Sequence, residues 1–328
     1  MRSAQMGLNK VVSLWRQLAS DGARGAMRLL WNVARLELSA LLGREYVRRR
    51  VHGNRMDLRV RDRGVSRALA IFGSREVLET EIFRREVGEG MTVVDLGANV
   101  GYYTLLAASI VGPRGKVYAI EPVPENFEQL RRHVRLNGYE PIVETFELAI
   151  SDTVGTTRMY LGLASNLHTL VDVDDEPAGA AKPTIEVQTT TLDRFLAAKR
   201  PVEFLRMDIE GGEVLVFDGM QELLKRSKRP QILFEVHPIG SIDPDPRYTP
   251  RLERLLAAGY HCRYAISSFH PTALGRYRSL GYEPVKVATS GQAIFEGIRD
   301  EHVLAIAARR PKITRALLLA PEPRAGRA

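Results

Sequence analysis

The chain has 328 residues, of which 45% are hydrophobic, and it carries a formal net charge of +8. Its single cysteine, Cys262, excludes a disulfide framework and a cysteine-based zinc site. No apolar run reaches the roughly 18 residues of a membrane span, and Arg16 and Asp21 interrupt any signal-peptide core, so a cytoplasmic protein is expected.

The positive charge lies almost wholly in the N-terminal region. Residues 1–63 carry 14 Lys and Arg against 5 Asp and Glu, a balance of +9, so the remaining 265 residues sum to −1. A nucleic-acid groove in that remainder would need a basic stripe. The sequence therefore predicts no DNA partner and argues against RNA as a partner of the core.

Two amphipathic helices are predicted ahead of the core. Apolar residues recur at helical spacing at Val11, Leu14, Trp15 and Leu18, and again at Met27, Leu30, Trp31, Ala34, Leu38 and Leu41. Most of the basic residues fall off this stripe, namely Arg16, Arg24, Arg28 and Arg35. We expect the helices to cap the domain or a second subunit of a homo-oligomer, as surface helices commonly do. The alternative is peripheral contact with an anionic membrane.

A hairpin and two helices connect this region to the core. Residues 46–51 and 56–61 flank the turn His52-Gly53-Asn54. Helices are predicted over residues 67–72 and 76–87, with Ser74 as the N-cap of the second. Residues 1–72 are therefore assigned to an N-terminal extension, residues 73–310 to the main domain, and residues 311–328 to a partly disordered tail.

The core begins with residues 91–104, MTVVDLGANVGYYT. They predict a buried strand, a glycine turn and a helix from Tyr102, which is the layout of a nucleotide-binding βα unit. The spacing is Asp-x-Gly-x-Asn-x-Gly, with Asp95 ahead of the first glycine. A carboxylate there repels a pyrophosphate but suits the ammonium and sulfonium groups of S-adenosylmethionine (SAM), which is the expected cofactor.

The next two strands supply further polar groups. Residues 116–120 lead to Glu121-Pro122, and an acid at this strand end is placed to bind a ribose diol. NAD would use the same acid, so only Asp95 distinguishes the two cofactors. A strand over residues 142–150 delivers Ser151 and Asp152, and Asp152 either accepts a hydrogen bond from the adenine amino group or forms an Asx turn or helix cap.

Residues 155–182 are harder to interpret. A strand is expected near residues 157–161 and another over residues 184–188. Asn166 and His168 are candidates for contact with the acceptor. The acids at Asp172, Asp174, Asp175 and Glu176 lack the spacing and central glycine of an EF-hand, so a solvated loop is expected.

Two later strands end in ionisable residues. Residues 202–213, VEFLRMDIEGGE, place Asp208, Glu210 and Glu213 after a buried strand, and residues 231–238, QILFEVHP, place Glu235 and His237 after another. Carboxylates this close need a cation, a hydrogen-bond donor or a proton between them. If the two strands are neighbours, these groups converge on one cleft.

If SAM donates a methyl group here and the acceptor is a hydroxyl, the reaction needs a base for the hydroxyl proton. His237 or one of the carboxylates is the candidate base. Alternatively, Asp208, Glu235 and His237 hold Mg²⁺ or a similar ion that lowers the pKa of the hydroxyl. Metal-independent chemistry is favoured, because carboxylates alone suffice and no metal-ligand spacing is diagnostic.

The C-terminal part completes the predicted sheet. Residues 260–266 are expected to form the sixth strand and residues 302–307 the last. The long insert between them, residues 267–299, is a candidate lid or acceptor-binding loop. The tail from Pro321 onward is expected to be disordered.

Four motifs carry a family resemblance: VVDLGANVGYYT, AIEP, LRMDIEGGE and LFEVH. In this order they resemble the FkbM family of SAM-dependent methyltransferases, over residues 73–310. The resemblance implies an α/β, Rossmann-like class I methyltransferase fold, with a seven-stranded, mostly parallel sheet and helices on both faces. It also implies that Glu76 faces the cofactor pocket, and that the reaction is O-methylation of a hydroxyl on a sugar, glycolipid or other secondary metabolite.

The predicted site has two parts. The cofactor-binding set comprises Glu76, Asp95, Gly97, Ala98, Asn99, Gly101, Tyr103, Glu121, Pro122, Ser151, Asp152 and Asp208, and the catalytic set comprises Asp208, Glu210, Glu235 and His237. The alternatives are an RNA methyltransferase and a non-catalytic, SAM-binding or membrane-attached scaffold. An NAD-dependent dehydrogenase ranks last, because of Asp95.

Overall fold

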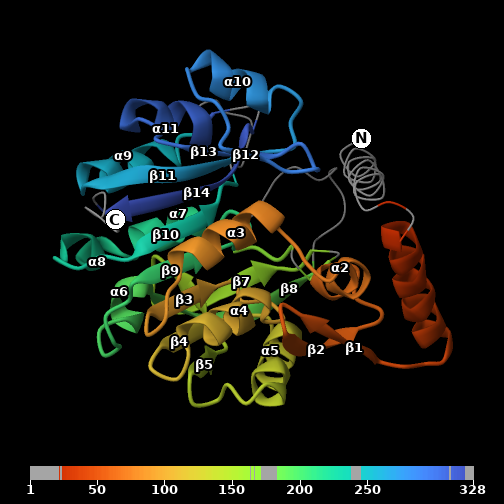
Figure 1. The fold of residues 1–328 in the computed structure, drawn as a ribbon. Coiled ribbons are helices and arrows are strands. Elements are labelled where there is room, and N and C mark those ends of the chain that lie inside the picture. The colour runs from red at the N-terminus through yellow and green to blue at the C-terminus, as the bar shows by residue number, and fades with distance from the viewer. Residues whose placement is uncertain are drawn as a thin grey trace.

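The computed structural model describes residues 22, 24–162, 164–165, 167–170, 183–237, 245–309 and 312–321. The predicted helix over residues 11–18, Asn166 and the acidic residues 172–176 lie outside these ranges. A nine-stranded sheet in the order β12-β13-β11-β14-β10-β9-β3-β4-β5 forms the centre of the molecule (Figure 1). Its strands are β3 (Thr92–Leu96), β4 (Lys116–Ile120), β5 (Val143–Phe146), β9 (Phe204–Met207), β10 (Gln231–Glu235), β11 (Tyr260–Ser267), β12 (Lys286–Val287), β13 (Ala293–Glu296) and β14 (Thr314–Pro321).

The strand order creates a ligand-binding edge. Strands β5, β4, β3, β9 and β10 pair in parallel, whereas β14, β11, β13 and β12 join through antiparallel pairs. After β3 the chain adds β4 and β5 on one side and β9 and β10 on the other, so the order reverses between β3 and β9. In open α/β sheets ligands bind beyond the strand ends at such a switch point. The α/β, Rossmann-like prediction is confirmed.

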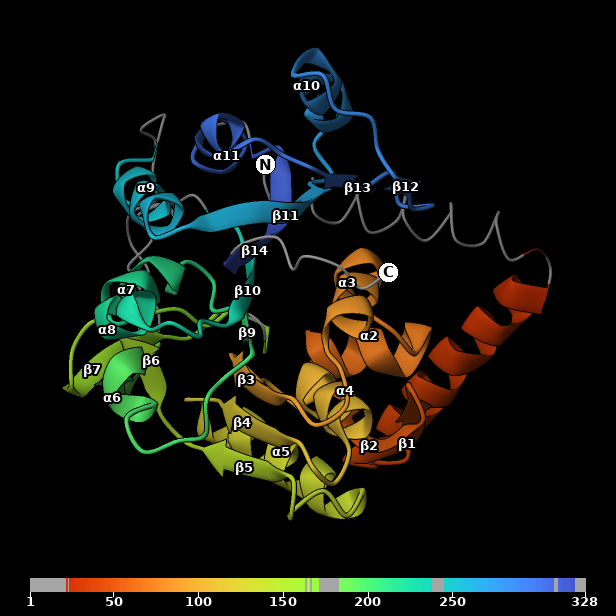
Figure 2. The same cartoon turned by 60° about the vertical axis from the view of Figure 1, so that its left-hand side comes forward.

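Helices cover both faces of the sheet (Figure 2). One face carries α3 (Val77–Glu86), α4 (Tyr102–Val111) and α5 (Pro124–Leu136), with α2 (Val65–Phe72) beside them; the other carries α6 (Leu192–Phe195), α7 (Glu213–Asp218), α8 (Gln221–Lys225), α9 (Thr249–Ala257) and α11 (Asp300–Ala307). Successive strand residues point to opposite faces. Val93 accordingly packs in the cluster beneath α3 and α4, and Val94 in the cluster beneath α7 and α9.

The C-terminal prediction is wrong in two respects. Residues 302–307 belong to helix α11, and the missing strand is β14, which lies between β10 and β11. Residues 314–321 therefore belong to the sheet and not to a tail. Leu317, Leu318 and Leu319 are fully buried, as expected for a strand covered on both faces.

The sheet is also wider than predicted. The insert of residues 267–299 contains α10 (Ala273–Ser279) and adds β12 and β13 to the predicted seven strands. Tyr277 of α10 stacks on Phe295 of β13 with ring centroids 4.1 Å apart. Much of the insert is thus packed onto the sheet edge and is not a free loop.

The predicted third strand is divided between two sheets. Residues 143–146 form β5 of the large sheet, whereas β6 (Ala149–Ser151) pairs with β8 (Thr184–Thr191), and β8 pairs with β7 (Gly155–Tyr160). This small sheet, in the order β6-β8-β7, lies near the carboxyl end of β4. Ala149 and Ile150 of β6 line a cavity there.

The N-terminal hairpin is confirmed as β1 (Tyr46–Val51) and β2 (Asn54–Arg59), although β2 begins two residues earlier than predicted, so Asn54 belongs to the strand and not to the turn. It packs on α5, where the Asp57 carboxylate pairs with Arg48 at 2.6 Å and with Arg132 at 2.7 Å. Ser74 is not the N-cap of α3; Glu76 occupies that position without a side-chain cap. Residues 24–41 form a helix beside the hairpin. Among the residues that the structure describes, no helix has the length and apolarity to cross a bilayer.

Candidate active site

Two adjoining cavities lie beyond the carboxyl ends of β3, β4 and β9. The larger has apolar walls that include Ile150 and Met159. The smaller has charged walls. Gly97, Asn99 and Asp208 line both cavities, so the two form one cleft with an apolar end and a charged end.

The glycine loop fits closely against the end of β9. Gly97 has φ +76°, and a Cβ atom added there would lie 2.2 Å from the backbone oxygen of Asp208. Only glycine combines this left-handed backbone with such close packing. Asn99 also has a positive φ, 50°, and its side-chain amide donates to the carbonyl of Ser165 at 2.6 Å.

Arg206 is the centre of a buried ion cluster at the charged end of the cleft. Its guanidinium donates to Asp95 Oδ1 at 3.3 Å and to Asp208 Oδ2 at 2.9 Å, and Glu76 Oε2 lies 3.7 Å away. The guanidinium also lies 4.3 Å from the ring centroid of Tyr103. We call Arg206, Glu76, Asp95 and Asp208 the arginine cluster. Burial lowers the pKa of Arg206, but the three carboxylates outweigh it and raise the pKa, so the guanidinium stays charged.

Asp95 does not line the cleft, although its place just before the glycine loop predicted contact with the cofactor. It is 1% exposed and lines neither cavity; its second oxygen, Oδ2, accepts a hydrogen bond from Thr104 Oγ1 at 2.7 Å. Burial raises the pKa of Asp95, and Arg206 and Thr104 oppose that rise. Asp95 therefore orients Arg206, while the expected contact between its carboxylate and a ligand's cationic groups is not part of this arrangement.

Glu121 bridges the glycine loop and the start of α5. Its carboxylate accepts hydrogen bonds from the backbone N–H of Asn99 at 2.8 Å and of Val123 at 3.0 Å, and it lines the larger cavity. Burial raises the pKa of Glu121 to about 7, although these hydrogen bonds oppose the rise. Ser151 and Asp152 do not line the cleft; the Ser151 hydroxyl donates to Asp152 at 3.0 Å.

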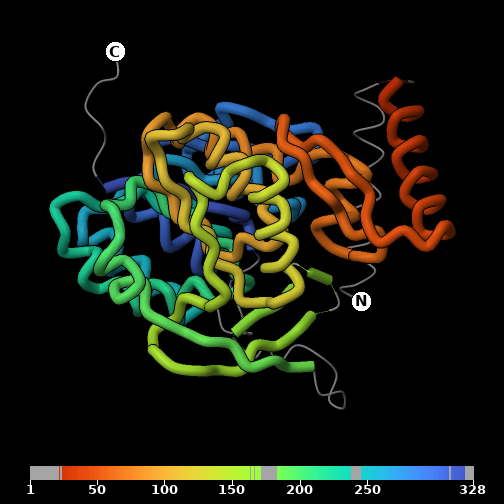
Figure 3. The backbone as a smooth tube through the Cα atoms, turned by 90° about the horizontal axis from the view of Figure 1, so that it is seen from below, coloured from red at the N-terminus to blue at the C-terminus, as the bar shows by residue number. Residues whose placement is uncertain are grey.

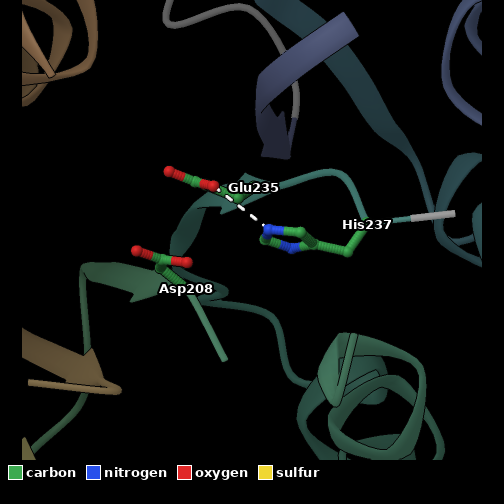
Figure 4. Close-up of side chains that lie close together, drawn as sticks. All are labelled: Asp208, Glu235 and His237. Atoms are coloured by element: carbon green, nitrogen blue, oxygen red, sulfur yellow. Dashed lines mark ion pairs between the residues drawn. The ribbon is translucent and has the colours of Figure 1, made fainter. Parts of the chain in front are cut away.

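A second ion cluster surrounds His237, which follows β10. Nδ1 lies 3.2 Å from Glu213 Oε1, and Nε2 lies 3.3 Å from Glu235 Oε2 and 3.5 Å from Glu210 Oε2. We call His237, Glu210, Glu213 and Glu235 the histidine cluster. Figure 4 shows the Asp208, Glu235 and His237 side chains close together, with an ion pair between Glu235 and His237, so the two strand ends converge as predicted.

The charge state of His237 follows from this geometry. Both ring nitrogens face carboxylates, so both are placed to donate, as only an imidazolium can. Burial and Lys312 lower the pKa of His237, but Glu213 and Glu235 outweigh them and raise it to about 10. His237 is therefore a cation near neutral pH.

Glu210 is the cluster member that reaches the cleft. It lines the larger cavity, its side chain is 27% exposed, and its backbone φ is +51°, an uncommon conformation for a residue other than glycine. Burial raises the pKa of Glu210 to about 7, while His237 opposes the rise. Such a carboxyl exchanges a proton readily near neutral pH.

No local sequence pattern indicated the two cations that β14 and the residues just before it bring here. Arg315 pairs with Glu235 and lies 3.7 Å from Glu79, and the partly exposed Lys312 lies close enough to lower the pKa of His237. Burial raises the pKa of Glu235, but Arg315 and His237 outweigh it and lower the pKa. Arg206 had a recognisable signal, since an arginine inside an apolar strand needs a buried partner.

The predicted metal ligands do converge but do not fit Mg²⁺. Asp208, Glu235 and His237 each offer one atom within 4.8 Å of the others. Arg206 and Arg315 already neutralise the two carboxylates, and His237 carries a proton that a metal would have to displace. Mg²⁺ also prefers oxygen ligands in octahedral geometry.

The cleft gathers most of the predicted residues. It is lined by Glu76, Gly97, Ala98, Asn99, Tyr103, Glu121, Pro122, Asp208 and Glu210. The residues that stand behind the lining or apart from it are Asp95, Gly101, Ser151, Asp152, Glu235 and His237. His168 lines the larger cavity, and Arg75 and Tyr102, which were not predicted, line the smaller one.

Comparison with protein families gives one assignment. The model of the family described as "Methyltransferase FkbM domain" matches residues 95–264, slightly more than half of the chain. The match spans the glycine loop and both ion-cluster strands, and it ends within β11. It leaves out the N-terminal extension and β14.

Curated relatives match over shorter stretches. Methyltransferase sdnD of Sordaria araneosa is 26% identical over 157 residues, which cover 40% of this chain and 60% of that protein. Protein-L-isoaspartate O-methyltransferase of Aeropyrum pernix is 44% identical over 55 residues, which cover 17% of this chain and 21% of that protein. The chain thus spans between about a fifth and three fifths of the length of these relatives.

Two solved structures are distantly similar. The O-methyltransferase from Bacillus cereus in complex with SAH is 14% identical, with a TM-score of 0.39 over 68% of this chain and 80% of that chain. Fibrillarin from Aeropyrum pernix, solved with bound S-adenosyl-L-methionine, is 15% identical, with a TM-score of 0.36 over 58% of this chain and 68% of that chain.

Proposed function

The chain belongs to the FkbM family of methyltransferases, and we propose that this SAM-dependent enzyme methylates a hydroxyl oxygen of a small-molecule or glycan acceptor, such as a sugar, a glycolipid or another secondary metabolite. The observation that supports oxygen as the methylated atom is Glu210, a carboxyl with a pKa near 7 at the wall of the cleft. A hydroxyl acceptor needs such a proton acceptor, and an acid–base group works best with a pKa near the operating pH.

The two ends of the cleft suit the two ends of SAM. The apolar larger cavity suits the adenine ring, with Glu121 beside the ribose hydroxyls. The smaller cavity presents Arg75 and Arg206 to a carboxylate, and Glu76 and Asp208 to an ammonium group. When bound, SAM supplies an electrophilic methyl group.

In the proposed reaction Glu210 is the base. Glu210 Oε2 faces His237, which leaves Oε1 to take the proton of the hydroxyl. The acceptor oxygen forms the new bond to the methyl carbon as the bond between that carbon and sulfur breaks, and its proton passes to Glu210. His237 is a positioning residue in this scheme, because its ring nitrogens already carry protons.

The first test is titration calorimetry with S-adenosylhomocysteine and with NADH. We expect binding of the former and none of the latter. The second test is methyl transfer from SAM to a panel of methyl glycosides and glycolipid extracts, read by mass spectrometry. Transfer to RNA in place of these acceptors would contradict the proposal.

Glu210→Gln tests the assigned base. We expect it to bind S-adenosylhomocysteine as the unmodified protein does but to lower kcat by about 10²–10⁴-fold. The unmodified protein should lose activity as pH falls through about 7, where Glu210 becomes protonated. Glu140→Gln, at an exposed position, is the matched control and should change neither. Full activity of Glu210→Gln would exclude Glu210 as the base.

A further inference from the structure

The helix of residues 24–41, here called the N-terminal helix, is anchored by one side only. Leu36 and Ser39 are buried, and the Asn32 side chain donates to the carbonyl of Ile71 in α2 at 2.9 Å. Glu37 pairs with Arg67 of α2 at 2.8 Å. These contacts fix which face of the helix turns away from the domain.

The face turned away is apolar. Its large side chains are Met27, Leu30, Trp31, Leu38 and Leu41, with Leu42 just beyond the helix, and each is between 55% and 84% exposed. At 3.6 residues per turn the five helical positions fall within an arc of about 100°. The expected packing of this stripe on the domain is therefore wrong for the described residues. Figure 3 shows the helix, in red, at the outer edge of the molecule.

A basic border adjoins the stripe. Arg24, Arg28 and Arg35 are exposed and lie along one flank, within about 40° of each other at the same helical period. The acid on the helix, Glu37, is already paired with Arg67. An apolar stripe with a cationic border is the arrangement of helices that lie in the plane of an anionic bilayer surface.

We propose that the N-terminal helix docks this methyltransferase on an anionic lipid surface, with the stripe at the boundary of headgroups and acyl chains and the three arginines against lipid phosphates. A second copy of the chain is less suitable as the occupant, because a two-fold contact joins identical faces and this face offers the arginines no acid: Glu37, the acid on the helix, is paired with Arg67. The sequence before the helix is also basic, since residues 1–23 contain three basic residues and one acid, Asp21.

The test is flotation of the full chain with phosphatidylcholine vesicles, with and without phosphatidylglycerol. We expect binding to the anionic vesicles only, weakened as NaCl screens the arginines. Trp31→Glu/Leu38→Glu should weaken partitioning by about tenfold or more, because it removes two large apolar groups from the lipid contact. The matched control, Phe269→Glu/Val285→Glu, changes two apolar residues that are exposed elsewhere and should leave partitioning unchanged.

Three outcomes would overturn the proposal. They are no vesicle binding by the full chain, equal binding of the helix variant, and equal binding to neutral vesicles. A dimer that the helix variant converts to a monomer, without vesicle binding, would identify a second copy as the partner. Titration of each variant with S-adenosylhomocysteine and circular dichroism verify that the fold is intact.

Discussion

The arginine cluster and the histidine cluster are built alike but behave differently. Each places a buried cation among carboxylates at the end of a strand, β9 for Arg206 and β10 for His237. Arginine cannot be deprotonated in a protein, whereas histidine can. The cation of the first cluster therefore keeps its charge, whereas the charge of the cation in the second cluster depends on pH.

The difference indicates a division of labour within one cleft. The arginine cluster holds the glycine loop to β9, since Arg206 also donates to the carbonyl of Gly97 at 3.1 Å. The histidine cluster includes Glu210, whose carboxyl titrates near neutral pH. One cluster forms part of the charged end of the cleft, and the other supplies the group that accepts a proton in the proposed reaction.

Arg206→Met should have the largest effect on stability. It leaves Asp95 and Asp208 buried without their cation, and the loss of one partner of a buried pair costs about 3–5 kcal/mol. Urea unfolding followed by circular dichroism measures the change. Arg206→Lys keeps the charge but not the bidentate geometry, so a smaller loss is expected. Unchanged stability of Arg206→Met would show that the cluster is not structural.

The pH dependence of stability should distinguish the two clusters, because the cation of the histidine cluster can lose its proton and that of the arginine cluster cannot. The pKa of His237 is about 10 in the folded protein against an ordinary value of 6.5. Folding therefore binds a proton between these values, so the stabilisation is complete below pH 6.5 and is lost as pH rises to about 10. The free energy of unfolding should fall by up to about 1.4 kcal/mol per pH unit in this window.

His237→Gln provides the comparison for that measurement. Its unfolding free energy should vary less between pH 7 and 10 than that of the unmodified protein. Arg206→Lys, with an intact His237, should retain the slope. If His237→Gln has the slope of the unmodified protein, the titrating group lies elsewhere.

Thr104→Val should have the smallest effect. It removes the hydroxyl that donates to Asp95 Oδ2, and an unsatisfied buried acceptor costs about 1–3 kcal/mol. The pH dependence assigned to His237 should persist, because Thr104 contacts Asp95 of the arginine cluster and does not belong to the histidine cluster. Thermal unfolding measures the loss, and Thr104→Ser, which restores the hydroxyl, should recover most of it.

The sequence was most informative where local pattern and function coincide. The glycine loop, Glu121 and the two acidic strand ends follow from motifs a few residues long, and the structure places Gly97, Glu121, Asp208 and Glu210 on one cleft. The hairpin could also be predicted from a local pattern, because a short turn joins its two strands.

Long-range contacts were beyond the sequence. The burial of Asp95 behind Arg206 depends on the pairing of β3 with β9, more than 100 residues later. Arg315 was missed because β14 was assigned to the tail, although its run of three leucines is typical of a buried strand. The exposure of the apolar stripe on the N-terminal helix also could not be predicted, because an amphipathic pattern does not identify which face of a helix packs on the domain.

The position of β14 has a consequence for how the protein is made on the ribosome. This strand is synthesised after both of its neighbours, β10 and β11, and it occupies the gap between them. It also carries Arg315 to Glu235. The sheet cannot close, nor the histidine cluster gain this cation, until translation has passed residue 321. A nascent chain interrupted earlier would expose two unpaired strand edges, which are sites for aggregation.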